Sequence, residues 1–171
     1  KSHIVRFGIF FSLFILLSFI HVKVWHGIGY LFYFIILLML IWALYFGITI
    51  SGSQRWINLY LLNLQPSELM KIAIIIAFAK FYHRIQASEV NSIKNIVQPI
   101  VLLCLPIFLV VAQPDLGTSI LIAGSGISVM WLSGLNLKYF IYSFLLLLVT
   151  TPFAISFLKP YQKLRVLTFF N

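Results

Sequence analysis

Gln65-Pro66-Ser67-Glu68-Leu69-Met70-Lys71 is a short polar string that leads at once into the apolar run Ile72–Ala79. Pro66 suits the first position of a helix, where its missing N–H costs nothing. The string therefore predicts a helix start with Glu68 and Lys71 one turn apart on the same face. An ionisable side chain inside a membrane helix costs about 2.5–3.5 kcal/mol on insertion scales, so it usually has a partner or a task. We expect Glu68 and Lys71 to be partners.

Around this string the chain is strongly apolar. Of its 171 residues 62% are hydrophobic and only 9% are charged, whereas soluble domains carry about 25% charged residues. The composition predicts an integral membrane protein. The net charge of +9 comes from Lys and Arg residues scattered between apolar runs, so it does not indicate a nucleic-acid partner. It indicates loop charges that orient helices in a membrane, a minority of which meet anionic lipid headgroups.

Six apolar runs have the length that a bilayer core of about 30 Å requires. They predict an all-α, polytopic membrane helical bundle, a single transmembrane domain over residues 1–171. Between the second and third runs, Ser51–Leu64 is too polar and too short to span. Its Trp56 and Tyr60 are interface residues spaced by four, which favours an in-plane amphipathic or re-entrant segment. The expected spans are residues 4–20, 28–50, 66–82, 96–112, 116–132 and 139–158.

The fifth apolar run is marked by small residues. In the fifth run a stripe of mostly small side chains recurs at helical spacing, which favours close packing of another helix. A groove for a lipid tail is the alternative. The stripe consists of Ser119, Ala123, Gly126, Met130 and Ser133.

Charges in the loops predict an orientation. Five cations occupy the internal loops of one side, and Arg55 is the only strong cation in those of the other. The positive-inside rule makes the first side cytoplasmic, when charges near the two ends are discounted because they can belong to long loops. Arg55, the Gln65–Glu68 string and the Gln113–Asp115 string then face outward. The five cytoplasmic cations are Lys23, Lys80, Arg84, Lys94 and Lys138.

The outward polar residues admit structural and functional interpretations. Glu68 can stabilise a helix start and Lys71 can extend to the interface. Alternatively, a buried Glu68–Lys71 pair lines a polar cavity where Lys71 binds a diphosphate oxygen or tunes the carboxylate's pKa. Asp115 is a good helix N-cap. Arg55 can pair with Asp115 or Glu68, grip a phosphate, or serve as an interfacial anchor.

These motifs together resemble the SEDS family (shape, elongation, division and sporulation), and within it the rod-shape-determining members. The likeness rests on Gly52-Ser53-Gln54-Arg55-Trp56-Ile57, on the Gln65–Lys71 string, and on Gln113-Pro114-Asp115-Leu116-Gly117-Thr118-Ser119. Trp131-Leu132-Ser133-Gly134-Leu135 and Pro160-Tyr161-Gln162-Lys163-Leu164-Arg165-Val166 fit the same pattern. The matches keep the family's order and spacing across nearly the whole chain.

The resemblance implies ten transmembrane helices, of which this chain would hold about the second to the seventh, lacking the first and the last ones. It implies polymerisation of lipid II into glycan strands on the outer face of the bacterial inner membrane, beside a class B penicillin-binding protein. Arg55, Gln65, Ser67 and Asp115 then become substrate-binding residues, with Glu68 and Lys71 in supporting catalytic roles. The family's proposed catalytic aspartate would lie beyond Asn171, so this segment alone is expected to be inactive.

Cofactors and competing functions stay open at this stage. No two His residues have metal-ligand spacing with a carboxylate, so no protein metal site is expected, although a divalent cation could assist the reaction. A lipid II flippase or transporter is an alternative, because buried charge and kinked helices also mark transport paths. A truncated, inactive scaffold that binds a penicillin-binding protein is another.

Overall fold

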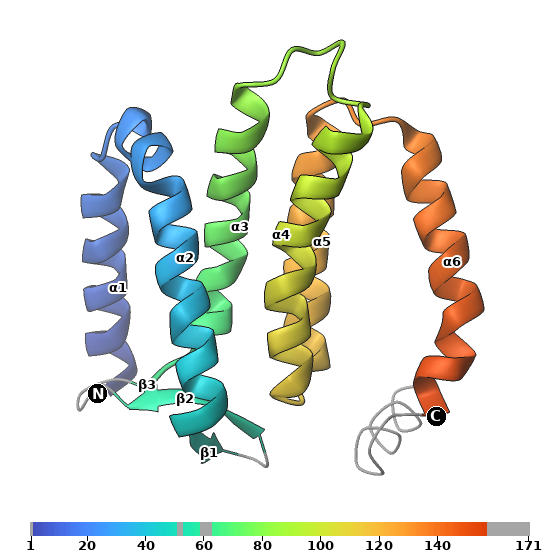
Figure 1. Cartoon of the computed structure of the whole chain (residues 1–171). Coiled ribbons are helices and arrows are strands. Elements are labelled where there is room, and N and C mark those ends of the chain that lie inside the picture. Colours follow the sequence, from blue (N-terminus) through green and yellow to red (C-terminus); the bar gives the residue numbers. More distant parts are fainter. Residues whose placement is uncertain (1, 51–52, 59–62, 157–171) are drawn as a thin grey trace. The chain divides into compact units, whose positions relative to one another are not determined.

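A computed structural model of the chain describes residues 2–50, 53–58 and 63–156. This part is mostly helical, with six α-helices and three short strands (Figure 1). The chain divides into two compact units, Lys1–Gly134 and Leu135–Asn171. The elements are α1 (Ser2–Ser18), α2 (Val22–Phe46), β1 (Ile48–Ile50), β2 (Ser53–Asn58), β3 (Asn63–Leu64), α3 (Pro66–His83), α4 (Ile93–Ala112), α5 (Leu116–Leu132) and, in the second unit, α6 (Leu137–Ser156).

Helix α2 ends earlier than the sequence predicts. We expected the second apolar run to continue as a helix to residue 50, but the helix stops at Phe46 and Gly47 is its C-cap. The Gly47 N–H donates to the carbonyl of Ala43 over 3.0 Å. A Cβ at Gly47 would lie 2.3 Å from that carbonyl oxygen, so this close approach requires glycine. The three residues that follow pair as a strand instead.

The segment after α2 forms a small sheet, which the all-α prediction did not include. The in-plane or re-entrant placement of Ser51–Leu64 stays a prediction. The strands of the sheet are antiparallel in the order β1-β2-β3, with Ile48 opposite Trp56 and Ile57 opposite Leu64. β-branched and aromatic residues favour this pairing. Tyr60, the other half of the spacing that suggested an amphipathic segment, lies outside the described residues.

Helix α3 is the centre of the first unit. It packs against α2 on one side and α5 on another, and α4 packs against α5. The α3 side chains at this junction are completely shielded, and they meet buried apolar residues of the three neighbouring helices. The fully buried apolar residues are Met70, Ala73, Ile74, Ala77 and Phe78 of α3, with Leu40 and Ala43 of α2, Val110 of α4 and Ile122 of α5.

The surface of the helices carries many large apolar side chains. Large aromatic and aliphatic side chains, such as Phe34 and Trp42 on α2 and Phe108 on α4, are more than half exposed. Such faces are typical of helices surrounded by lipid. Among the described helices, α2 and α4 are long and apolar enough by themselves to cross a membrane. The six-span count therefore stays a prediction.

Gly126 of α5 is closely packed and lies inside the stripe of small residues predicted to pack against another helix. A Cβ built there would lie 2.6 Å from Cδ1 of Leu103 on α4, and 3.3 Å from Cε2 of Phe78 on α3. The interpretation as a helix-packing stripe is thus supported at Gly126. Gly124, on the same helix, has nothing within 4 Å of such a Cβ.

These two glycines give a matched test of the packing. We expect Gly126→Val to lower the free energy of unfolding by about 1–3 kcal/mol, because extra atoms in a full core force neighbours out of place. Gly124→Val brings the same change in helix propensity without the clash. The apparent melting temperatures of the two variants in detergent provide the measurement. Equal shifts in both would contradict the packing assignment.

Candidate functional site

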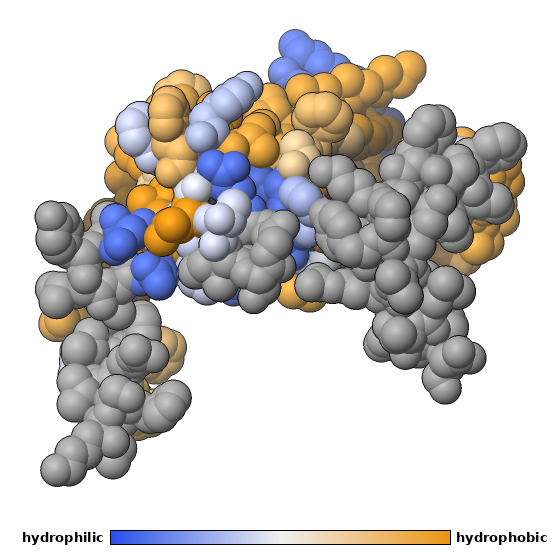
Figure 2. Space-filling view, turned by 90° about the horizontal axis from the view of Figure 1, so that it is seen from below, coloured by the Kyte–Doolittle hydropathy of each residue, from blue (hydrophilic) through white to orange (hydrophobic). Residues whose placement is uncertain are grey.

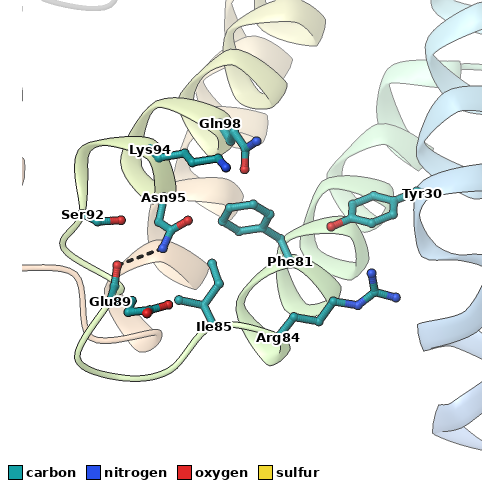
Figure 3. Close-up of a pocket in the computed structure, with 9 residues that line it drawn as sticks. All are labelled: Tyr30, Phe81, Arg84, Ile85, Glu89, Ser92, Lys94, Asn95 and Gln98. Atoms are coloured by element: carbon teal, nitrogen blue, oxygen red, sulfur yellow. Dashed lines mark hydrogen bonds between the residues drawn. The ribbon is translucent and has the colours of Figure 1, made fainter.

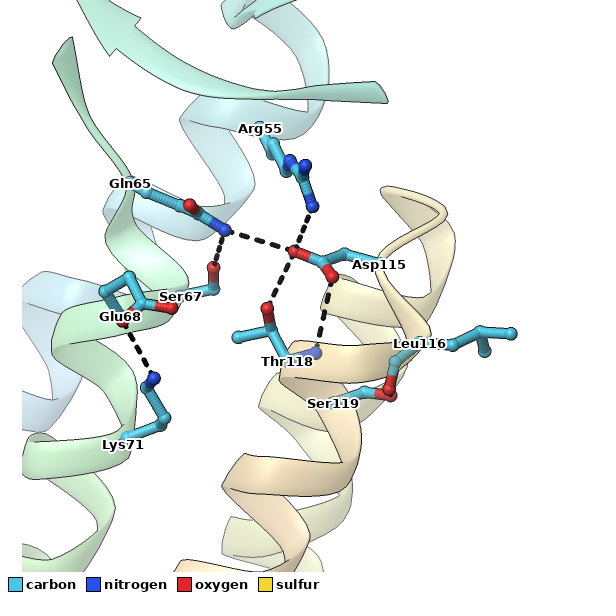
Figure 4. Close-up of polar contacts among 9 residues, drawn as sticks. All are labelled: Arg55, Gln65, Ser67, Glu68, Lys71, Asp115, Leu116, Thr118 and Ser119. Carbon is cyan, nitrogen blue, oxygen red and sulfur yellow. Dashed lines mark hydrogen bonds and ion pairs between the residues drawn. The ribbon is translucent and has the colours of Figure 1, made fainter. Parts of the chain in front are cut away.

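A polar cluster occupies the sheet end of the first unit, where α2 ends and α3 and α5 begin (Figure 1). Viewed from this end, hydrophilic surface gathers near the middle, with hydrophobic surface beside it (Figure 2). Five side chains from three elements form the cluster. They are Arg55 of β2, Gln65 and Ser67 at the start of α3, and Asp115 and Thr118 at the start of α5 (Figure 4).

Asp115 is the hub of this cluster. Its Oδ2 lies 2.7 Å from Nη1 of Arg55 and accepts hydrogen bonds from Thr118 Oγ1 at 2.8 Å and Gln65 Nε2 at 3.1 Å (Figure 4). Its Oδ1 accepts the backbone N–H of Thr118 at 3.3 Å. The residue is therefore the N-cap of α5, as its position predicted. Of the two carboxylates proposed as partners for Arg55, the structure selects Asp115.

The surroundings of Asp115 keep it ionised. Burial by itself raises the pKa of this carboxyl, whose side chain is only 9% exposed. The hydrogen bonds from Thr118 and Arg55, together with the guanidinium charge, outweigh burial and hold the pKa below its usual range. At neutral pH Asp115 is therefore a carboxylate, and it ties β2 to the starts of α3 and α5.

The Gln65 side chain does not cap helix α3, although its position suggests that it would. Gln65 is the N-cap residue of α3 but its side chain makes no capping hydrogen bond. Instead its Nε2 donates both to Asp115 Oδ2 and, over 3.0 Å, to Oγ of Ser67. Ser67 is 1% exposed. The predicted substrate-binding residues Arg55, Gln65, Ser67 and Asp115 thus form one connected network.

Glu68 and Lys71 form the expected pair, although not a buried one. Nζ of Lys71 lies 2.8 Å from Oε2 of Glu68. The Glu68 side chain is 54% exposed and that of Lys71 24%, so the sharper prediction of a buried pair is wrong for the carboxylate. Helical geometry explains why: at the third position of α3, Glu68 lies on the face turned away from the buried Ser67 and Met70. The exposed carboxylate of Glu68 can move away, and Lys71 can then bind another anion.

Two contributors were not singled out from the sequence as site residues. Thr118 supplies two hydrogen bonds to Asp115. Gln113 is 1% exposed, and its Nε2 donates to the carbonyl of Leu40 over 2.8 Å. This bond joins the end of α4 to α2 just behind the cluster. The sequence signal for Gln113 was its position between an apolar helix and a proline. A glutamine buried at such a place needs hydrogen-bond partners for its amide.

Together with the neighbouring Glu68–Lys71 pair, the cluster brings two cations and two carboxylates to this end of the unit. Guanidinium and ammonium groups can hold the oxygens of a phosphate or diphosphate. The buried network fixes Arg55, whereas Lys71 is held only by an exposed carboxylate. No group of three or more His, Cys, Asp or Glu side chains that could hold a metal occurs in the described ranges. Participation of a divalent cation stays an open prediction.

Comparison with known proteins gives the relatives of this chain. A family model for FtsW, RodA and SpoVE, described as "Cell cycle protein", matches residues 1–171. The chain is 30% identical over 171 residues to the probable peptidoglycan glycosyltransferase FtsW of Buchnera aphidicola subsp. Baizongia pistaciae, covering 100% of this chain and 45% of the relative. It is 38% identical over 146 residues to the peptidoglycan glycosyltransferase MrdB of Escherichia coli K12, covering 85% and 39%.

Solved structures agree with these relatives. A chain of a complex described as "Structural coordination of polymerization and crosslinking by a peptidoglycan synthase complex" matches with a TM-score of 0.80 and 31% identity, over 95% of this chain and 48% of that one. The rod shape determining protein RodA of Thermus thermophilus matches with a TM-score of 0.72 and 28% identity, over 85% and 48%. The chain thus spans about half the length of the proteins it matches.

Proposed function

The chain belongs to the FtsW, RodA and SpoVE family of cell cycle proteins, and from this membership we propose that it is part of a peptidoglycan glycosyltransferase that polymerises lipid II during cell-wall elongation. The names of its relatives support the reaction class, and the likeness to RodA supports a role in cell shape. The single observation in this chain that carries the proposal is the pairing of two cations, Arg55 and Lys71, with a polar network at one end of an otherwise apolar bundle.

The chemistry of the reaction gives this cluster a task. Glycosyl transfer from lipid II releases a lipid diphosphate, and developing negative charge on a leaving group is stabilised by preorganised cations. Lys71 is the better placed of the two, because its partner Glu68 is exposed and can move away. Arg55 is fixed by Asp115, so it serves to position the donor. Gln65 and Ser67 add neutral hydrogen-bonding groups beside it.

We place the chain in the bacterial inner membrane with its six helices as spans and the sheet end outward. The loop charges support this orientation by the positive-inside rule. The exposed apolar faces of the helices support burial in lipid. Lipid II would then reach the cluster from the outer leaflet. A class B penicillin-binding protein is the proposed partner, supported by the likeness to a chain of a peptidoglycan synthase complex.

The proposal is tested with the full-length protein that carries this chain, purified with its penicillin-binding partner and supplied with lipid II. A ladder of glycan strands on a gel is the expected result. Movement of labelled lipid II across liposome membranes without any polymer would replace the transferase by a flippase. Co-purification of the partner with neither activity would indicate a scaffold.

A further inference from the structure

The opposite end of the first unit holds an unexplained cavity of about 640 Å³. Its walls come from α2, the end of α3, the α3–α4 loop and the start of α4 (Figure 3). It combines two cations, several neutral polar groups and an apolar surface. The lining residues are Tyr30, Phe81, Arg84, Ile85, Glu89, Ser92, Lys94, Asn95 and Gln98.

The charge in this cavity is not balanced. Arg84 and Lys94 lie on opposite sides of the Phe81 ring (Figure 3), and neither has an ion-pair partner among the described residues. Glu89 is the one carboxylate in the lining. The two cations and one anion leave a net charge of +1. Ser92 is the N-cap of α4, but its side chain makes no capping hydrogen bond, so its hydroxyl is available to a ligand.

A buried cation behind the cavity strengthens the positive field. Lys80 is only 9% exposed. Its Nζ donates to the carbonyl of Gly27 over 2.6 Å and lies 5.0 Å from the ring centroid of Tyr30, a residue that also lines the cavity. No described carboxylate pairs with Lys80. The nearest acidic residue on its own helix is Glu68, twelve residues away, or about 18 Å along the axis.

Two histidine rings lie at the same end of the unit. The rings of His26 and His83 lie 4.9 Å apart, edge to face, and Nε2 of His26 is buried without a partner among the described residues. Because Lys80, Arg84 and Lys94 have no carboxylate partner among the described residues, this concentration of positive charge favours a bound anion.

We propose that this cavity binds the phosphate of an anionic phospholipid of the inner leaflet, with Arg84 and Lys94 as its ligands. Neutral donors on Ser92, Asn95 and Gln98 surround the same space, and Phe81 and Ile85 supply apolar contact for the lipid's glycerol and chain ends. A free phosphate ion would gain nothing from those apolar residues, which favours the lipid. The proposal rests on the membrane placement proposed above, and its site is at the opposite end of the unit from the polar cluster.

The test compares the full-length protein with two double variants in nanodiscs of phosphatidylethanolamine containing a minority of phosphatidylglycerol. Native mass spectrometry then counts the phosphatidylglycerol that each protein retains. Arg84→Gln/Lys94→Gln is expected to lower this retention at least about tenfold, because two charge-assisted hydrogen-bonding groups are lost. Lys23→Gln/Lys138→Gln removes the same charge outside the cavity and is expected to retain the lipid like the parent protein.

Three outcomes would overturn the proposal: equal retention by both double variants, no preference for phosphatidylglycerol over phosphatidylethanolamine, or displacement by soluble glycerol phosphate as effective as by the lipid. The third would assign the cavity to a soluble phosphate compound. The glycan ladder is measured on the same samples. A parent protein that makes no polymer but retains the lipid would refute the proposed function and leave this site standing.

Discussion

Replacing Asp115 with alanine is expected to lower the free energy of unfolding by about 3 kcal/mol. The change leaves Arg55 without its carboxylate, and its Nε is already buried without a partner among the described residues. Removing one member of a buried ion pair costs about 3–5 kcal/mol. Because the Arg55 side chain is 25% exposed, we expect a cost at the lower end of this range. Loss of the α5 N-cap adds to the effect.

The apparent melting temperature of the detergent-solubilised full-length protein provides the measurement. Thr118→Val is the graded control: it removes one hydrogen bond to Asp115 and keeps the ion pair, so it should cost only about 1 kcal/mol. The Arg55→Ala/Asp115→Ala double variant should be less unstable than the sum of the singles, because the two residues interact directly. If Asp115→Ala melts like the parent protein, the network does not hold this end of the unit together.

The helix starts were predictable because their signals are local. Pro66 fixes the first residue of α3, and Asp115 caps α5 at the expected position. The contact of Glu68 with Lys71 followed from helical spacing in the same way. A residue's propensity and its near neighbours are enough to decide such features.

Contacts between distant segments could not be predicted from local sequence in the same way. Gln65 and Asp115 are 50 positions apart, and nothing local distinguishes Asp115 from Glu68 as the partner of Arg55. The sheet was missed because Trp56 and Tyr60 at a spacing of four indicated a helical face. The β-branched run Ile48-Thr49-Ile50, followed by the Ser-Gly-Ser turn signal, was the better guide. Burial of Lys80 beside Tyr30 depends on how α2 packs on α3, which no single segment encodes.

Replacing Lys71 with alanine in the full-length protein is expected to reduce polymerisation of lipid II about a hundredfold or more, while the fold is preserved. Its exposed i,i+3 pair with Glu68 contributes only about 0.2–0.5 kcal/mol to stability, so the melting temperature should hardly change. A cation that stabilises charge on the leaving diphosphate, in contrast, accounts for about 10²–10³ in rate. Asp115→Ala and Lys71→Ala thus differ in their effect on stability: the first lowers it, whereas the second leaves it nearly unchanged.

The initial rate of glycan formation, measured together with the melting temperature, distinguishes these roles for Lys71. Lys71→Arg keeps a cation at the same position of α3 and should recover part of the rate, although its planar geometry differs from that of an ammonium. Glu68→Gln removes the charge that competes with the diphosphate for Lys71. If Glu68 only holds Lys71 in place, this variant keeps most of the activity; if the charge of its carboxylate is required, activity falls as in Lys71→Ala. Unchanged polymer from Lys71→Ala itself would refute the assignment, because the leaving group would then be stabilised by other residues.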